Sequence, residues 1–210
     1  MRKITLFTML LIGSHCFAFD ILDAFKAMPD YLIPTFNSVL KSELINSYIN
    51  GSDSIENRYA GKSKITLLDT DNHLLQIQTS DVGKIELKIF TPTPTDTIIG
   101  YINTICTPEC TSVIKVFNRQ WNELSLETID YKDFITAKDT DRIALFESWD
   151  MPQFIEYSFT EKNTIKAKFA TFFYLDDEQQ KQMKSIVKKS LTLKMKPQEP
   201  NSQKYILDTF

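Results

Sequence analysis

The chain has 210 residues, of which 42% are hydrophobic and 24% are charged, with a formal net charge of −3. This composition is that of an ordinary folded domain, and it excludes a disordered or fibrous protein. Only five glycines and two histidines are present. Because the glycines are widely spaced, the chain has no Gly-rich phosphate loop, no dinucleotide fingerprint and no G-x-S-x-G nucleophile elbow.

The first eighteen residues are typical of a secretory signal peptide. Arg2 and Lys3 precede an uncharged apolar stretch over residues 4–13, which is shorter than the roughly 20 residues of a membrane-spanning helix. Small side chains at Cys16 and Ala18 fit the positions that a signal peptidase reads. We therefore expect cleavage after Ala18 and an exported chain in the periplasm or cell envelope, with no transmembrane segment in the mature protein.

Two alternatives to this processing stay open. The apolar stretch could be a buried N-terminal helix, or Cys16 could carry a lipid anchor, although the bulky His15 before it fits that cleavage poorly. Cleavage after Ala18 would remove two of the 24 basic residues and none of the 27 acidic ones, which makes the net charge −5. An acidic protein is repelled by phosphate backbones, so we expect no nucleic-acid partner.

The first third of the mature chain is predicted to be helical. Asp20 is a suitable N-cap for a short helix that carries an i, i+3/i+4 apolar stripe and ends at Pro29. A second helix is expected to follow from Asp30, with Pro34 in its first turn. It should end at Gly51, because glycine accepts the left-handed conformation that terminates helices.

From Lys62 the apolar period changes from about 3.6 to 2, which is typical of half-buried strands. Within residues 85–90, for example, isoleucine and leucine at odd positions alternate with Glu86, Lys88 and Phe90. Short connections favour antiparallel hairpins. Further strands are expected over residues 98–105, 113–117, 154–159, 165–174 and 191–195.

Residues 119–152 show no clear period beyond one possible helical turn over residues 131–135. Asp176 should cap a helix that runs to Ser190 with its lysines outward. We predict a single α+β domain over residues 19–196, in which N-terminal helices precede a largely antiparallel, meandering sheet with a further helix near the C-terminus. Residues 197–210 are expected to form a polar tail.

Cys106 and Cys110 lie between two predicted strands of an exported chain, and we predict that they form a structural disulfide. Opposed residues of an antiparallel pair are close enough for a bridge, and the compartment is oxidising. A redox-active pair would need a cation or a helix N-terminus nearby, whereas Glu109 adds a negative charge. A closed zinc site needs four ligands, and the mature chain offers only these cysteines and His73.

His73 and a group of four carboxylates are the remaining polar residues with possible chemistry. His73 follows the sequence DTDN, but the turn glycine and distal glutamate of a calcium loop are missing, so we predict a solvated hairpin turn. A hydrolase could work with two carboxylates alone. The candidate carboxylates are Asp139, Asp141, Glu147 and Asp150. No cofactor is expected.

Trp149 and Met151 are the candidate contact surface. They lie in a predicted loop, and tryptophan and methionine are enriched at protein interfaces.

The sequence also resembles a known family, the secreted Bacteroidales proteins grouped as domain of unknown function 3256. The resemblance rests on the signal, AMPD at residues 27–30, IP at 33–34, NRYAGKS at 57–63 before LL at 67–68, TICTPEC at 104–110, and residues 117–121. It covers residues 19–125 best. The family has no assigned activity, so the resemblance implies export and a shared architecture but no mechanism.

We therefore expect an exported binding or structural protein without catalytic function, whose partner is a protein or a glycan. Two alternatives remain. The first is a carboxylate-dependent hydrolase of envelope glycans, and the second is an inhibitor or accessory protein of an envelope enzyme.

Overall fold

The computed structural model describes residues 19–52, 54–93, 96–136, 140–150, 152–171, 175–199 and 202–209. The predicted signal peptide lies outside these ranges. Within them the helices are α1 (Ile21–Ala27), α2 (Ser38–Ile49), α3 (Thr140–Ser148) and α4 (Asp177–Ile186). The strands are β1 (Ile55–Glu56), β2 (Lys62–Asp69), β3 (Leu74–Gln78), β4 (Gly83–Thr93), β5 (Asp96–Cys106), β6 (Cys110–Asn118), β7 (Glu123–Glu127), β8 (Ile155–Phe159), β9 (Ile165–Phe169), β10 (Ser190–Pro197) and β11 (Lys204–Thr209).

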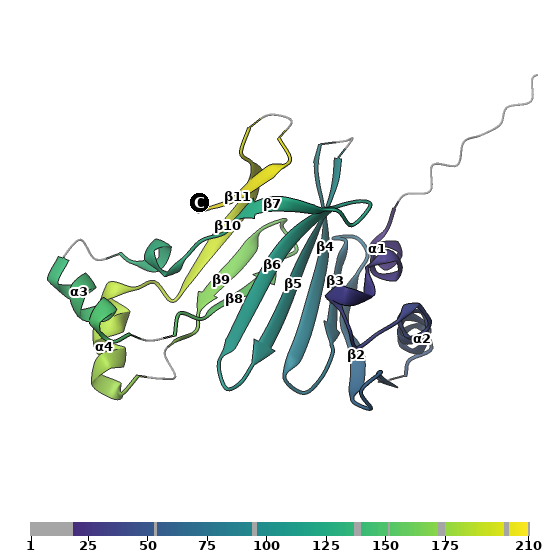
Figure 1. Ribbon diagram of the computed structural model, residues 1–210, viewed down its shortest axis with the longest axis horizontal. Coiled ribbons are helices and arrows are strands. Elements are labelled where there is room, and N and C mark those ends of the chain that lie inside the picture. The colour runs from purple at the N-terminus through teal and green to yellow at the C-terminus, as the bar shows by residue number, and fades with distance from the viewer. Residues whose placement is uncertain are drawn as a thin grey trace, which may run out of the picture.

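These strands form one sheet in the order β1-β2-β3-β4-β5-β6-β7-β11-β10-β9-β8 (Figure 1). Neighbouring strands are antiparallel, except that β7 and β11 run parallel. The sheet folds over at β7, so that its last strand, β8, packs against β4, β5 and β6. We call the side of β2–β6 that faces β8 the inner face and the opposite side the helix face. The structure thus has the predicted helices and mostly antiparallel sheet, although strands dominate it. None of the helices described here is long and apolar enough to cross a membrane.

On the helix face, α1 and α2 cover an apolar cluster. The side chains that β4 contributes to it are Ile85, Leu87 and Ile89, which are at most 5% exposed, and they pack with Phe25 and Phe36 of the N-terminal region. Burying this much apolar surface is the main favourable term that holds the helices on the sheet.

The caps explain where the first helices begin. Asp20 caps α1, as the sequence predicts. The second helix begins later than predicted, at Ser38, behind the N-cap Asn37. Pro34 disfavours helical geometry in the residue before it, so Asp30–Leu32 form only a 3₁₀ turn.

On the inner face, a second apolar cluster lies between β4–β6, the C-terminal strands, α3 and α4. At its tightest point β8 crosses Gly100 of β5. A Cβ atom at Gly100 would lie 2.7 Å from Cζ of Phe159 and 2.8 Å from Cε2 of Phe90. Glycine in this strand is therefore explained by the close approach of two aromatic rings.

The inner face corrects the expectation of a half-buried β4. Glu86 is 1% exposed and Lys88 is fully buried, because β8 and its neighbours cover this face as well. Alternation of polar and apolar residues usually marks a face in contact with water. Here Glu86 and Lys88 are instead covered by other strands, and the backbone amides of β8 require hydrogen-bond acceptors on the face that β8 covers.

Two C-terminal segments also differ from the sequence prediction. Residues 119–152, which showed no clear period, contain β7 and α3 as well as the expected helical turn at Tyr131–Phe134. The segment predicted as a polar tail contains β11, and its Tyr205 and Leu207 are 6% and 7% exposed. The pairing of β11 with β7 joins residues about eighty positions apart, so no local sequence pattern predicts it.

Candidate functional site

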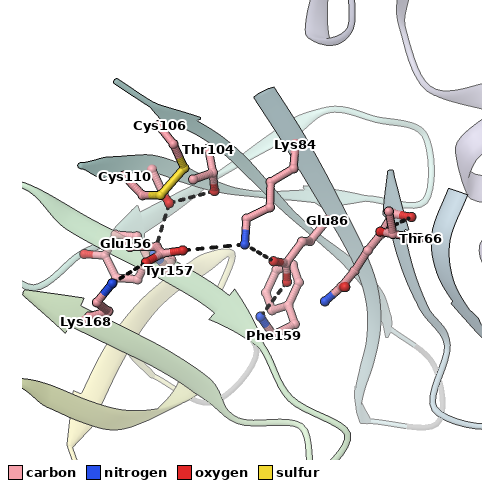
Figure 2. A network of polar contacts seen from close by, with 12 residues as sticks. Thr66, Lys84, Glu86, Thr104, Cys106, Cys110, Glu156, Tyr157, Phe159 and Lys168 are labelled. Atoms are coloured by element: carbon pink, nitrogen blue, oxygen red, sulfur yellow. Dashed lines mark hydrogen bonds and ion pairs between the residues drawn. A yellow bond between two sulfur atoms is a disulfide. The ribbon is translucent and has the colours of Figure 1, made fainter. Parts of the chain in front are cut away.

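Four charged side chains meet where β8 and β9 cross the inner face (Figure 2). Lys84 and Glu86 come from β4, Glu156 from β8 and Lys168 from β9. Nζ of Lys84 lies 3.3 Å from Oε1 of Glu86 and 3.6 Å from Oε1 of Glu156. Nζ of Lys168 lies 3.2 Å from Oε2 of Glu156. These four residues, the charge chain, alternate in sign and connect the two halves of the folded sheet.

The charge chain continues into hydrogen bonds that close the edge of β8. As the last strand of the sheet, β8 would otherwise carry unpaired backbone amides along that edge. The Phe159 N–H donates to Oε2 of Glu86 at 2.9 Å, and the Tyr157 N–H donates to Oγ of Ser112 at 3.0 Å (Figure 2). The Ser112 hydroxyl also lies 2.8 Å from Oγ1 of Thr104. Side chains of the inner face therefore satisfy the donors that the fold brings against them.

Glu86 is the most deeply buried member of the charge chain. Its side chain is 1% exposed, whereas that of Glu156 is 18% exposed and those of Lys84 and Lys168 are 37% and 39% exposed. Burial raises the pKa of the Glu86 carboxyl group, while the Phe159 amide and the Lys84 ammonium act in the opposite direction. The chain therefore runs from solvent to a carboxyl group inside the protein.

Glu86 and Glu156 are also the carboxylates that this network brings closest, since both lie within 3.6 Å of one ammonium nitrogen. Most glycosidases use a pair of carboxyl groups, and both groups must reach the sugar or its attacking water. Glu86 is covered by β8 and bound to a backbone amide of that strand. The arrangement is better suited to joining two sheet halves than to acid–base catalysis.

Cys106 and Cys110 form the predicted disulfide, with 3.9 Å between their Cα atoms. They are paired residues at the ends of β5 and β6, so the bridge closes this hairpin beside the charge chain (Figure 2).

A small pocket and three exposed aliphatic side chains lie at the same end of the sheet. The pocket has a volume of about 220 Å³ and is lined by Thr66, Gln78, Ser80, Asp81, Val82, Gly83, Lys84 and Cys106. Val82, Ile105 and Val113 are 46%, 50% and 57% exposed. We call the pocket and these three side chains the disulfide end.

The four carboxylates predicted as catalytic candidates lie elsewhere. Asp141 and Glu147 belong to α3, which packs against α4, and Asp150 follows that helix. The hydroxyl of Tyr131 donates to Oε1 of Glu147 at 3.1 Å. Asp139 lies outside the described residues. The fold instead brings together Glu86 and Glu156, which no local motif distinguishes from the other acids of the chain.

The predicted contact residues are only partly described. Trp149 is half-buried in the turn after α3, and its ring lies edge-on to that of Phe146 with 6.2 Å between centroids. Met151 lies outside the described residues. Their role in binding stays a prediction.

His73 lies in the turn between β2 and β3, as predicted, with Asp69 accepting hydrogen bonds from Asn72 in that turn. Within the described ranges, no group of three or more His, Cys, Asp or Glu side chains is placed to hold a metal ion.

Comparisons with known proteins add a family and a fold. The family described as "Protein of unknown function (DUF3256)" matches residues 14–199. Among solved structures, a domain of an uncharacterised protein from Porphyromonas gingivalis W83 superposes with a TM-score of 0.70 at 18% sequence identity, over 90% of this chain and 97% of that chain. At that identity the likeness concerns the fold alone. No curated protein matches the sequence significantly.

Proposed function

Because the chain belongs to the DUF3256 family of proteins of unknown function, we propose from its own geometry that it is an exported, non-catalytic binding protein of the periplasm or cell envelope. The signal-like N-terminus supports export. The Cys106–Cys110 disulfide also supports it, because such bridges persist in oxidising compartments.

The observation that carries the non-catalytic part of the proposal is the engagement of the Glu86 and Glu156 carboxylates. Both are held by lysines, and Glu86 also accepts the amide of Phe159. A catalytic carboxyl group must reach its substrate, whereas Glu86 faces the interior of the folded sheet.

The disulfide end is the surface that we propose for binding, with a protein as the partner. Its exposed side chains, Val82, Ile105 and Val113, are aliphatic, and contiguous exposed apolar groups mark protein interaction sites. The disulfide holds the β5–β6 hairpin that carries Ile105 and Val113, which lowers the entropy lost on binding.

Catalysis is tested with the processed protein on a panel of glycosides, esters and peptides. We expect no turnover. The glycan-hydrolase alternative would be supported instead if a substrate were turned over by the wild type and by Glu123→Gln, a matched change at an exposed glutamate, but not by Glu156→Gln.

Binding is tested with a photo-crosslinking amino acid at Val113 in the full-length protein, expressed in cells that naturally make it. The control position is Val39 on α2, which is 69% exposed. We expect a discrete protein adduct from position 113, absent from position 39 and lost when Ile105→Lys is added. Equal adducts from both positions, or none from position 113, would overturn the assignment of this surface.

A further inference from the structure

A second pocket lies where α4 passes into β10, and it shares no lining residue with the disulfide end. It has a volume of about 420 Å³ and is lined by Thr136, Gln180, Lys184, Val187, Lys188 and Lys189. Half of these residues are lysines and none is acidic, although the chain as a whole carries more acidic than basic residues. The volume lies within the range of small-molecule sites, about 300 to 1,000 Å³.

The backbone beneath these lysines is fixed on both sides. The Lys188 N–H donates to the Phe134 carbonyl at 2.8 Å, and the Lys189 carbonyl accepts the Phe169 N–H at 3.0 Å. Val187, which is 4% exposed, forms a β-bridge with Ile135 and contributes to the base of the pocket. The lysines therefore project from a rigid segment, as a preorganised site requires.

None of the three lysines forms an ion pair with a residue in the described ranges. Lys184 lies in the last turn of α4, where its charge offsets the helix dipole. This explanation does not extend to Lys188 and Lys189, which lie in the connection between α4 and β10. Within the described ranges, no acidic side chain lines the pocket that these lysines share.

We propose that this pocket binds a phosphate group. Ammonium groups are strong point-charge donors to phosphate oxygens, and the three lysines line one concave site of suitable size. The Thr136 hydroxyl already donates to the Ile186 carbonyl at 3.1 Å, so it has no proton left for a phosphate oxygen. Nε2 of Gln180 donates to the Leu175 carbonyl at 3.1 Å and keeps a second N–H. The phosphate belongs either to a soluble molecule or to a lipid headgroup. This proposal is independent of the disulfide end.

The proposal is tested with the processed full chain in two arms. Pyrophosphate is titrated while backbone amide signals are followed by NMR, and sedimentation is measured with vesicles of phosphatidic acid and, separately, of phosphatidylcholine. The pocket variant is Lys188→Gln with Lys189→Gln. The control is Lys62→Gln with Lys64→Gln, which removes the same charge from exposed positions on β2.

We expect binding in at least one arm, weakened about tenfold or more in the pocket variant and less than about twofold in the control, because each lost charge-assisted hydrogen bond has an effect of that order. Pyrophosphate shifts at residues 186–189 would assign a soluble phosphate, and binding to phosphatidic acid vesicles alone would assign a lipid headgroup. Equal weakening in both variants, or no binding in either arm, would overturn the proposal.

Discussion

The two faces of β4 are buried by different means, although they belong to one strand. On the helix face, Ile85, Leu87 and Ile89 pack beneath α1 and α2. On the inner face, Glu86 and Lys88 are buried just as completely beneath β8 and its neighbours. Helices satisfy their own backbone amides, so they can cover an apolar surface. A folded-over edge strand brings unpaired amides with it and therefore needs acceptors from the face that it covers.

Glu86 and Ser112 of the inner face meet that requirement, whereas Lys88 is paired with the turn between β2 and β3. Glu86 and Ser112 accept the two β8 amides, and Nζ of Lys88 donates to the Asn72 carbonyl at 2.9 Å. Buried polar groups cost stability unless they are paired. A polar side chain of β4 on the helix face would meet no unpaired backbone amide, because the helices satisfy their own.

The largest effect is expected from placing a carboxylate on the wrong face. Leu87→Glu buries a charge beneath the helices, where no unpaired backbone N–H can donate to the carboxylate. It should therefore lower the free energy of unfolding by more than about 4 kcal/mol. The conservative Leu87→Met should cost less than about 1.5 kcal/mol. Urea denaturation of both variants checks this, and similar stability of the two would contradict the difference between the faces.

The next effect concerns the approach of β8 to the inner face. Gly100→Ala places a methyl group 2.7 Å from the Phe159 ring, and such overpacking should cost about 1 to 3 kcal/mol. The double variant Gly100→Ala with Phe159→Leu should lose less free energy of unfolding than the two single variants lose together, because the smaller side chain at position 159 makes room for the methyl group. Strict additivity in thermal denaturation would show that the two residues do not meet.

A smaller effect is expected from opening the Cys106–Cys110 disulfide. The closed loop is only a few residues long, so its loss should lower stability by about 2 kcal/mol or less. Thiol titration of the unreduced, processed protein should find no free thiol, and denaturation with and without reductant measures the difference. Two free thiols before reduction would refute the bridge.

The smallest effect is a dependence on pH. Burial raises the pKa of Glu86 above its ordinary value of 4.5, so the folded state binds more protons than the unfolded chain between the two values. The contribution of Glu86 to stability is then complete below pH 4.5 and is lost as the pH rises through the folded value. The stability of the wild type relative to Glu86→Gln should fall over that interval.

Asp208 supplies a control of opposite sign. Its hydrogen bond to Lys196 lowers the pKa of the Asp208 carboxyl group, so its contribution is present at higher pH and is lost as the pH falls through the folded value. Denaturation of Glu86→Gln and Asp208→Asn across the acidic range should show opposite slopes relative to the wild type. Slopes of the same sign would contradict the burial of Glu86.

Features that depend on neighbouring residues could be predicted from the sequence. The Asp20 and Asp176 caps, the hairpin strands and the Cys106–Cys110 bridge each carry a local signal of residue type and spacing, and the structure has all of them. The local sequence also placed Gly100 within a strand. It did not show that the Phe159 ring lies too close to this position for any larger residue.

Features that depend on distant pairing could not be predicted. β11 looked like a polar tail because its partner β7 is remote in sequence and is itself short. Glu86 looked like a solvent-facing residue because alternation does not reveal that β8 folds onto β4 from about seventy positions away. The charge chain was missed for the same reason, since its members come from three strands.

The central claim is that the inner-face carboxylate of Glu86 binds the edge of β8, and native-state hydrogen exchange of the Phe159 amide tests it most directly. In the wild type this amide should exchange slowly, and Glu86→Ala should accelerate it while amides in the β4–β5 ladder stay protected. Ser112→Ala should instead accelerate the Tyr157 amide and leave that of Phe159 slow. Fast exchange of the Phe159 amide in the wild type, or a rate unchanged by Glu86→Ala, would contradict the account.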